Sequence, residues 1–221
     1  LGTGTNTCYI EDNRNITKVP SVAMQEGFTI INIESGGFDK VPRGEIDIRF
    51  DSSTDNPGAQ KFEKMISGAY LGRLVLEIMK IAAAEGLFSK EFAGRIREIR
   101  NLTTRDINEF TLSGHFDCGN EADEKDRVIL YYIIDSVLER AARLAAANLA
   151  GVMLKTGKGK NPCLPVCVAA EGTTFHKSRL FKYKLDYYIK RFLNDEMGIY
   201  CDFVKAENIV LTGAAIAGLL N

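Results

Sequence analysis

The chain has 221 residues, of which 45% are hydrophobic and 26% charged, an ordinary composition for a soluble globular protein. Its 28 basic and 29 acidic residues leave a net charge of −1, so the basic excess typical of a nucleic-acid groove is absent and no nucleic-acid partner is expected. The length suits one large domain with a sizeable core.

The cysteine and histidine content argues against a metal site. There are five cysteines and two histidines, and only Cys163 and Cys167 lie close together along the sequence. A Cys/His zinc cage is therefore not expected, and reduced thiols of a cytosolic protein are the preferred interpretation. The first ten residues are polar, and the longest apolar stretch, Ile209 to Leu220, is too short to span a bilayer. We expect a cytoplasmic protein with no membrane partner.

The first strands are predicted at Cys8 to Ile10 and at Phe28 to Ile33, where a β-branched run ends before a Gly-Gly pair. Residues Gly44 to Phe50 alternate apolar and polar side chains, which predicts a short half-exposed strand or an extended loop. Leu1 to Gly4 resembles the end of a buried strand running into a turn, so we expect further chain upstream.

Helices are predicted through the middle of the chain. Asp55 and the Asn-Pro pair after it favour a helix start, and this helix is expected to run through Gln60, Glu63 and Ile66. Further helices are predicted over Leu71 to Gly86, Ser89 to Ile99, and about Glu121 to Leu154. The expected buried stripe of the longest helix is Val128, Tyr131, Ile134, Val137, Leu138, Ala142, Ala145 and Leu149. Its alanine-rich part, Ala141 to Ala150, indicates close packing on a sheet.

The last part of the chain alternates strands and helices. Lys155 to Lys160 lacks the spacing of a Walker phosphate loop and is interpreted as a solvated connector. The predicted elements after it are a buried strand at Leu164 to Ala170, a turn at Glu171 to Thr174, a helix at Lys177 to Asn194, a strand at Met197 to Val204 and a helix at Leu211 to Leu220. Strands alternating with helices favour an α/β layered domain, and no linker divides residues 1–221.

Three groups of residues could form a ligand site. Gly2 to Asn6 offers backbone N–H groups and hydroxyls that can cradle phosphate, although for this segment alone an ordinary tight turn is the preferred explanation. Glu34 ends an apolar strand, where α/β sheets place ligand sites, although a solvated strand end is the alternative. Gln60 and Glu63 share one helix face, and Glu63 with Glu34 and Asn6 could accept hydrogen bonds from the hydroxyls of a sugar.

Two further features carry weaker signals. The Gly172-Thr173-Thr174 turn follows an apolar strand and could contact phosphate or ribose, or could be a turn alone. Neither His115 nor His176 lies in a triad or metal signature, so neither is given a catalytic role.

The order of these motifs is similar to that of the hexokinase family. The segments that carry the resemblance are Gly2-Thr3-Gly4-Thr5-Asn6-Thr7-Cys8-Tyr9, Ile31-Asn32-Ile33-Glu34, Asn56-Pro57-Gly58-Ala59-Gln60-Lys61-Phe62-Glu63-Lys64, Tyr70-Leu71-Gly72, Leu149-Ala150-Gly151-Val152 and Glu171-Gly172-Thr173. They cover most of the chain. The resemblance implies one lobe of the actin-like, ribonuclease-H-like ATPase fold, with a mixed sheet and flanking helices, and identifies residues 1–221 as the C-terminal large domain.

The resemblance also implies roles for individual residues. Asn6, Glu34, Gln60 and Glu63 would surround the hexose. Thr3 and Gly4 would contact ATP phosphates, and Gly68, Thr104, Gly172 and Thr173 would line the nucleotide site. Mg²⁺ would lie on the phosphates. The general base would be an aspartate upstream of Gly2, in an N-terminal small domain that also supplies a second phosphate loop, so no catalytic residue is assigned within this chain.

The chain departs from the family pattern at several positions. Ser35 stands where an aromatic residue is usual, Glu171 where an aspartate is usual, and Asn108 where serine is frequent. The Gly-Ser-Gly turn expected within Ala206 to Gly213 is absent. The resemblance implies ATP-dependent phosphorylation of a hexose, most simply glucose, at its 6-hydroxyl. A hexokinase-like sugar sensor without turnover and an actin-like assembly ATPase are the alternatives.

Overall fold

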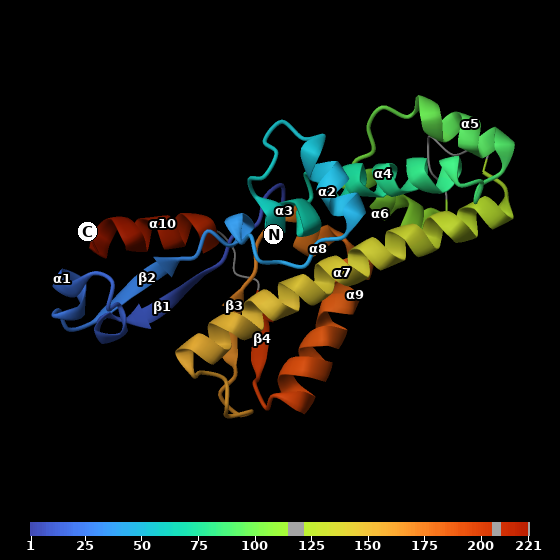
Figure 1. The fold of residues 1–221 in the computed structure, drawn as a ribbon. Helices are drawn as coiled ribbons and strands as arrows, with labels where there is room; N and C mark the ends of the chain where they lie inside the picture. The colour runs from blue at the N-terminus through green and yellow to red at the C-terminus, as the bar shows by residue number, and fades with distance from the viewer. Residues whose placement is uncertain (115–121, 205–208, 221) are drawn as a thin grey trace.

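The fold of the chain, in a computed structural model, is described for residues 1–114, 122–204 and 209–220 (Figure 1). The α-helices are α1 (Pro20–Ala23), α2 (Glu45–Ser52), α3 (Lys61–Ile66), α4 (Leu71–Ala84), α5 (Lys90–Glu98), α6 (Thr104–Ser113), α7 (Glu124–Thr156), α8 (Thr173–Lys177), α9 (Arg179–Tyr188) and α10 (Ile209–Leu220). The strands are β1 (Cys8–Asp12), β2 (Phe28–Asn32), β3 (Val166–Ala169) and β4 (Cys201–Val204). Short 3₁₀ helices η1 (Asn13–Asn15) and η2 (Ser35–Gly37) and a π-helix, η3 (Ile189–Glu196), complete the description.

The strands pair in both orientations. β1 and β2 are antiparallel, with Cys8 opposite Asn32 and Asp12 opposite Phe28. β3 and β4 are parallel, with Val166 opposite Cys201. Within the described residues the two pairs are not hydrogen-bonded to each other, so the mixed sheet expected from the sequence is present as two two-stranded sheets.

The long helix α7 crosses the molecule from α5 to the loop before β3 (Figure 1). It packs mainly on α9, and also on α4 and α3. The main partners of α7 as a whole are therefore helices, whereas the sequence indicated close packing of Ala141–Ala150 on a sheet. The predicted stripe is confirmed for Ile134, Val137, Leu138 and Ala142, whereas Val128 is 49% exposed.

Tyr131, also expected in that stripe, is exposed, because the buried face at the start of α7 carries Asp126 and Leu130 instead. The predicted start of this helix at Glu121 lies outside the described residues.

Residues Gly44 to Phe50 form a helix rather than the predicted strand or extended loop. Gly44 precedes the first turn of α2, and its N–H donates to Asp47 Oδ2 at 2.9 Å. The residues buried by α2 are Asp47, Phe50 and Asp51, which follow a helical spacing. The alternation along Ile46 and Ile48 was misleading because Ile48 faces solvent.

The helix predicted from Asp55 begins later, at Lys61. Ala59 N–H donates to Asn56 O at 3.2 Å, which forms a turn where helix was expected. Gly58 and Gln60 both have positive φ, +80° and +49°, so the chain cannot continue as a right-handed helix through them. Gln60 is thus the residue before α3 rather than a residue within it.

The other predicted elements are confirmed with small shifts. The helix predicted from Ser89 begins at Lys90, with Ser89 as its cap, and α4 ends just before Gly86. The strand predicted as buried at Leu164 to Ala170 is shorter, and its residues alternate between partly buried and exposed. The helix predicted from Lys177 divides into α9 and η3, and α6 was not predicted.

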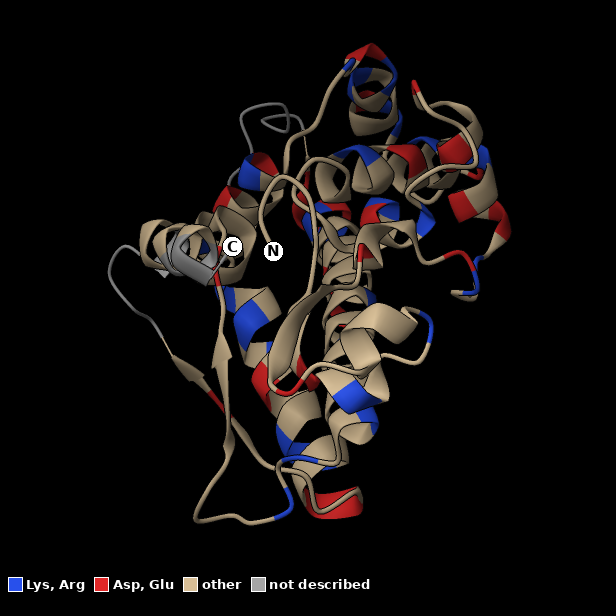
Figure 2. Cartoon of the chain, turned by 90° about the vertical axis from the view of Figure 1, so that its left-hand side faces the viewer, with Lys and Arg blue, Asp and Glu red and all other residues tan. Residues whose placement is uncertain are grey.

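Charged residues of both signs are mixed along the helices (Figure 2), in agreement with the net charge of −1. In the part of the chain that the structure describes, every helix is too short or too polar to cross a membrane.

Candidate functional site

The turn from Gly4 to Asn6 lies against the side chain of Glu63 from α3. The N–H of Thr5 donates to Glu63 Oε2 at 2.8 Å. A methyl group added at Gly4 would lie 2.7 Å from the same oxygen, so only glycine allows this approach without a shift. The backbone of the Gly-Thr-Gly segment therefore fixes one oxygen of Glu63, and its other carboxylate oxygen remains to accept a ligand hydroxyl.

Gln60 and Glu63 converge on η2, the short turn after β2. A methyl group on buried Gly36 would lie 2.8 Å from Gln60 Oε1 and 3.2 Å from Glu63 Oε2. It would also lie 3.1 Å from Thr5 O, so the Gly4–Asn6 turn, η2 and α3 meet at this point. Gln60 and Glu63 do not share a helix face as predicted, because Gln60 precedes the helix, but both side chains approach Gly36.

Asn6 and Glu34 are joined through Asn32, a residue to which the sequence analysis gave no role. Asn6 Nδ2 donates to Asn32 Oδ1 at 2.5 Å, and Asn32 Nδ2 donates to Glu34 Oε1 at 2.5 Å. All three side chains are exposed. The position of Asn32 two residues before Glu34 was the available signal, because alternate residues of a strand point to the same side.

Backbone geometry singles out two of these residues. Glu34 (φ +55°) and Gln60 (φ +49°) are the non-glycine residues with positive φ among the described residues. Such a conformation costs roughly 1–2 kcal/mol for a residue with a Cβ atom. Strained residues of this kind cluster at ligand sites, and both belong to the four assigned to the hexose.

A second cluster joins the residues assigned to the nucleotide. Gly68 N–H donates to Gly2 O at 2.7 Å, and Ala69 N–H donates to Thr3 O at 3.1 Å. Thr104 Oγ1 donates to Gly68 O at 2.7 Å and accepts from Gly72 N–H at 3.2 Å. The start of the chain, the α3–α4 turn and the start of α6 are therefore held together.

The turn before α8 completes this cluster. Leu1 N donates to Glu171 O at 2.5 Å, and a methyl group on Gly172 would lie 2.3 Å from Leu1 O, so glycine is required there. Buried Thr174, which had no assigned role, donates from Oγ1 to Gly2 O at 3.1 Å. Thr3, Gly4 and Thr173 are exposed, and a methyl group on Gly2 would lie 3.5 Å from Thr173 N.

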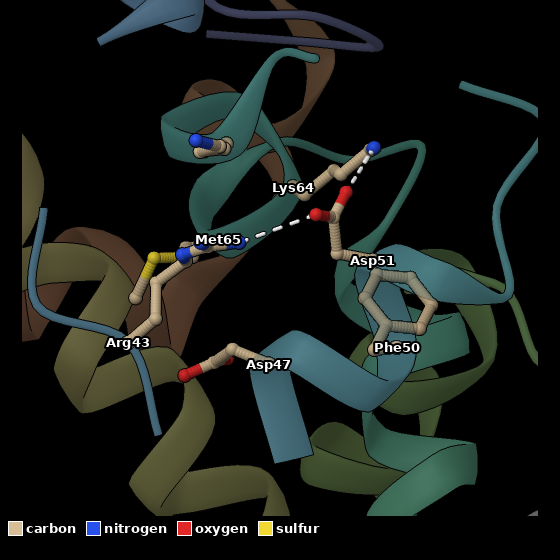
Figure 3. Close-up of a pocket in the computed structure, with 7 residues that line it drawn as sticks. Arg43, Asp47, Phe50, Asp51, Lys64 and Met65 are labelled. Atoms are coloured by element: carbon tan, nitrogen blue, oxygen red, sulfur yellow. Dashed lines mark hydrogen bonds and ion pairs between the residues drawn. The ribbon is translucent and has the colours of Figure 1, made fainter. Parts of the chain in front are cut away.

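A small charged pocket lies between α2 and α3 (Figure 3). Its lining is Arg43, Asp47, Phe50, Asp51, Lys61, Lys64 and Met65. Lys64, only 3% exposed, donates to Asp51 Oδ1 at 2.5 Å and to Asn56 O at 2.7 Å. Asp51 also accepts from Gly58 N–H and pairs with Arg43 at 3.2 Å. The Asp51–Lys64 ion pair, with its hydrogen bonds to Gly58 and Asn56, fixes the loop that leads to Gln60.

The pKa of Asp51 reflects this environment. Burial raises the pKa of the carboxyl, but the hydrogen bonds from Lys64 and Gly58 N–H and the positive charges of Lys64 and Arg43 outweigh it, so the pKa lies below its usual value. The carboxylate is therefore the form that the folded protein favours.

Other residues that the sequence analysis considered are not part of the two clusters, or fall outside the residues that the structure describes. Asn108 lies on α6, and its Oδ1 is buried with no hydrogen-bond partner among the described atoms. His176 Nε2 is 4.0 Å from the exposed carboxylate of Glu171. His115 and the start of the Ala206–Gly213 segment are outside the described residues. Across those that are described, no group of three or more His, Cys, Asp or Glu side chains could hold a metal ion.

Comparison with known proteins identifies the family to which the chain is related. The sequence model of a family described as hexokinase matches residues 1–220. Hexokinase-5 of Oryza sativa subsp. japonica is 38% identical over 181 residues, which cover 73% of this chain and 35% of the rice protein. Hexokinase-2 of Rattus norvegicus is 32% identical over 235 residues, which cover 98% of this chain and 25% of the rat protein. The chain thus spans between a quarter and about a third of these relatives.

Solved structures agree at the level of the fold. The hexokinase from Schistosoma mansoni complexed with glucose matches with a TM-score of 0.70 and 25% identity, over 92% of this chain and 47% of that one. A second hexokinase crystal structure, 22% identical, also has a TM-score of 0.70. The class of fold is therefore the actin-like ATPase fold of hexokinases, as the sequence predicted. The chain belongs to the hexokinase family.

Proposed function

We propose that the protein to which residues 1–221 belong transfers the γ-phosphoryl group of ATP to the 6-hydroxyl of a hexose, with glucose as the first candidate. The observation that carries this proposal is the convergence of Glu63 and Gln60 on η2, beside the turn that bears Asn6. A site rich in carboxylate and amide groups suits a ligand that presents many hydroxyls.

Each of the four residues has a distinct part in this proposal. Glu34 and Glu63 accept hydrogen bonds from sugar hydroxyls, and Gln60 and Asn6 add amide groups that can donate and accept. Thr5 N–H already occupies one Glu63 oxygen, which orients the other. Fixed acceptors hold the reacting hydroxyl in place, and positioning of this kind supplies much of the catalysis in phosphoryl transfer.

The nucleotide is proposed to lie along the second cluster. Gly4 and Gly172 leave the backbone uncovered where side chains would clash, which suits the approach of phosphate oxygens. Exposed Thr3 and Thr173 offer hydroxyl donors, and Gly68 and Thr104 brace the junction behind them. We place Mg²⁺ on the phosphates, where it would neutralise developing charge.

Residues 1–221 are proposed to be the C-terminal large lobe of the enzyme. An N-terminal lobe of the same protein would supply the general base, an aspartate upstream of Gly2, and close over the hexose to exclude water. A cytoplasmic location is proposed on the basis of the thiols, because Cys8, Cys163, Cys167 and Cys201 are free and a reducing compartment keeps them so.

A coupled phosphorylation assay on the complete gene product, with a panel of hexoses, tests this function. ATP-dependent formation of a hexose 6-phosphate is the expected result. Hexose binding in calorimetry without turnover would favour a sugar sensor instead. ATP hydrolysis with assembly into filaments and no hexose binding would favour an actin-like ATPase, a role for which a sugar cradle has no use.

A further inference from the structure

One asparagine of α7 reaches the turn that bears Asn6. Asn148 interrupts the alanine-rich part of the helix, and its Nδ2 donates to Thr7 Oγ1 at 2.5 Å. Thr7 lies between Asn6 and β1, and it is 141 positions away from Asn148 along the chain. Because α7 packs on α9, α4 and α3, a side chain anchored on it gives the turn a fixed point of attachment.

The same threonine hydroxyl also contacts the turn after Glu34. Ser35 Oγ donates to Thr7 Oγ1 at 3.4 Å, and Ser35 is only 3% exposed. Thr7 Oγ1 therefore lies where α7, the segment before β1 and η2 meet. Loss of the Thr7 hydroxyl would take this acceptor from both Asn148 and Ser35, which is unfavourable.

Thr7 and Ser35 in turn orient Asn6. Asn6 Oδ1 accepts from Thr7 N–H at 2.8 Å and from Ser35 N–H at 3.3 Å. With its oxygen held in this way, the amide of Asn6 directs Nδ2 toward Asn32, which donates to Glu34. A continuous series of hydrogen bonds thus runs from Asn148 to two residues of the proposed sugar site.

We propose that Asn148 is a positioning residue for the hexose site, acting through Thr7 on Asn6 and Glu34. The inference rests on the proposed function, because Asn6 and Glu34 are assigned to the hexose there. Asn148 itself is assigned no contact with sugar or nucleotide. Its removal should therefore affect the use of hexose and leave the use of ATP unchanged, since the nucleotide cluster is built from other residues.

The test uses the full-length protein with Asn148→Ala and, separately, Thr7→Val. A neutral hydrogen bond corresponds to a roughly twofold to tenfold effect, so the hexose KM should rise by about that factor while the ATP KM stays within twofold. The double variant should be no worse than the more affected single variant, because both changes break one connection. Thr7→Ser keeps the hydroxyl and should restore the hexose KM.

Thr156→Val is the matched control, because the Thr156 hydroxyl lies on the same helix and donates only to the helix backbone at Val152 O and Met153 O. It should leave both KM values unchanged. An active wild type whose hexose KM is unaffected by Asn148→Ala and Thr7→Val overturns this inference alone. A wild type that neither binds nor phosphorylates any hexose overturns the proposed function, and the inference with it. If Asn148→Ala fails to fold, the comparison of Thr7→Val with Thr7→Ser decides.

Discussion

Gln60 combines a strained backbone with a side chain that faces the proposed sugar site. Its left-handed conformation is unfavourable for glutamine and neutral for glycine. We expect Gln60→Gly to leave the free energy of unfolding unchanged or up to about 1 kcal/mol higher, because relief of strain is partly offset by the greater freedom of the unfolded chain. Hexose kcat/KM should nevertheless fall, since the amide is lost.

Urea unfolding and steady-state kinetics on the same samples check this expectation. Gln60→Val is the contrasting variant, because a β-branched residue tolerates positive φ poorly and should lower the free energy of unfolding by about 1–2 kcal/mol. Equal destabilisation by glycine and valine would show that the backbone at Gln60 is not strained.

Glu63 should act on the hexose and not on ATP. In Glu63→Gln the remaining oxygen can still accept from Thr5 N–H, so the new amide nitrogen faces the sugar hydroxyl with a donor in place of an acceptor. A hydrogen bond to a charged group is worth about 1.5–3 kcal/mol, so hexose kcat/KM should fall roughly tenfold to a few hundredfold. The ATP KM should move little in the same kinetic series.

Two variants serve as controls for Glu63. Glu85→Gln changes an exposed glutamate at the end of α4 and should leave both substrates unaffected. Thr3→Val removes a hydroxyl at the nucleotide cluster and should raise the ATP KM while the hexose affinity of the free enzyme stays unchanged. A rise in the ATP KM with Glu63→Gln as large as its effect on hexose would contradict the separate roles.

At the scale of elements, helices with a wide apolar stripe were predictable and short irregular segments were not. α4 and most of α7 follow a helical period over several turns, which no other structure satisfies. α2 was misread because Ile46 and Ile48 alternate with charged residues, and the decisive contact, Arg140 Nη1 to Asp47 Oδ2 at 2.8 Å, comes from a distant helix. Such tertiary contacts leave no local signal.

The residues of the candidate site also fall into those that sequence motifs could identify and those that depend on tertiary contacts. Asn6, Glu34, Gln60 and Glu63 could be named because their motifs occur in a recognisable order. Asn32, Asn148 and Thr174 could not be assigned, because their importance depends on which turns meet in space. The αL conformation of Gln60 was also hidden, since the Asn-Pro pair before it resembles a helix start.

The loop between α2 and α3 depends on the Asp51–Lys64 ion pair, which leads to a prediction of pH dependence. The pKa of Asp51 lies below its usual value in the folded state, so its carboxylate stabilises the fold above about pH 4, and this contribution is lost as the pH falls through the folded-state pKa. Asp51→Asn leaves the buried ammonium of Lys64 without its counter-charge and should lower the free energy of unfolding by about 3–5 kcal/mol at pH 7.

Urea unfolding between pH 7 and pH 3 measures both effects. The difference between wild type and Asp51→Asn should shrink as the pH falls below 4, because the wild-type carboxyl then becomes neutral as well. Asp55→Asn, an exposed aspartate in the same loop, is the control and should follow the wild type at every pH. A difference that stays constant with pH would mean that the charge of Asp51 is not what stabilises the loop.

At the scale of the whole molecule, the two clusters contact different ends of one short segment. Residues Gly2 to Asn6 contact the nucleotide cluster through Gly2 and the sugar cluster through Thr5 and Asn6. A segment of five residues therefore joins the proposed nucleotide cluster to the proposed sugar cluster. Neither cluster, as defined by its described residues, contains an aspartate that could accept the proton of the reacting hydroxyl.

The isolated polypeptide of residues 1–221 is therefore expected to show no hexose kinase activity. Loss of a general base alone slows such reactions about a hundredfold to ten-thousandfold, and loss of a second phosphate loop slows them further. The coupled assay with glucose and ATP should give no rate above background, while circular dichroism should show the helical content expected from α4, α7 and α9. The full-length protein, assayed beside it, is the positive control. Measurable glucose phosphorylation by the folded fragment would mean that the base lies within this chain, and the exposed carboxylates of the sugar cluster, Glu34 first, would then be the residues to substitute.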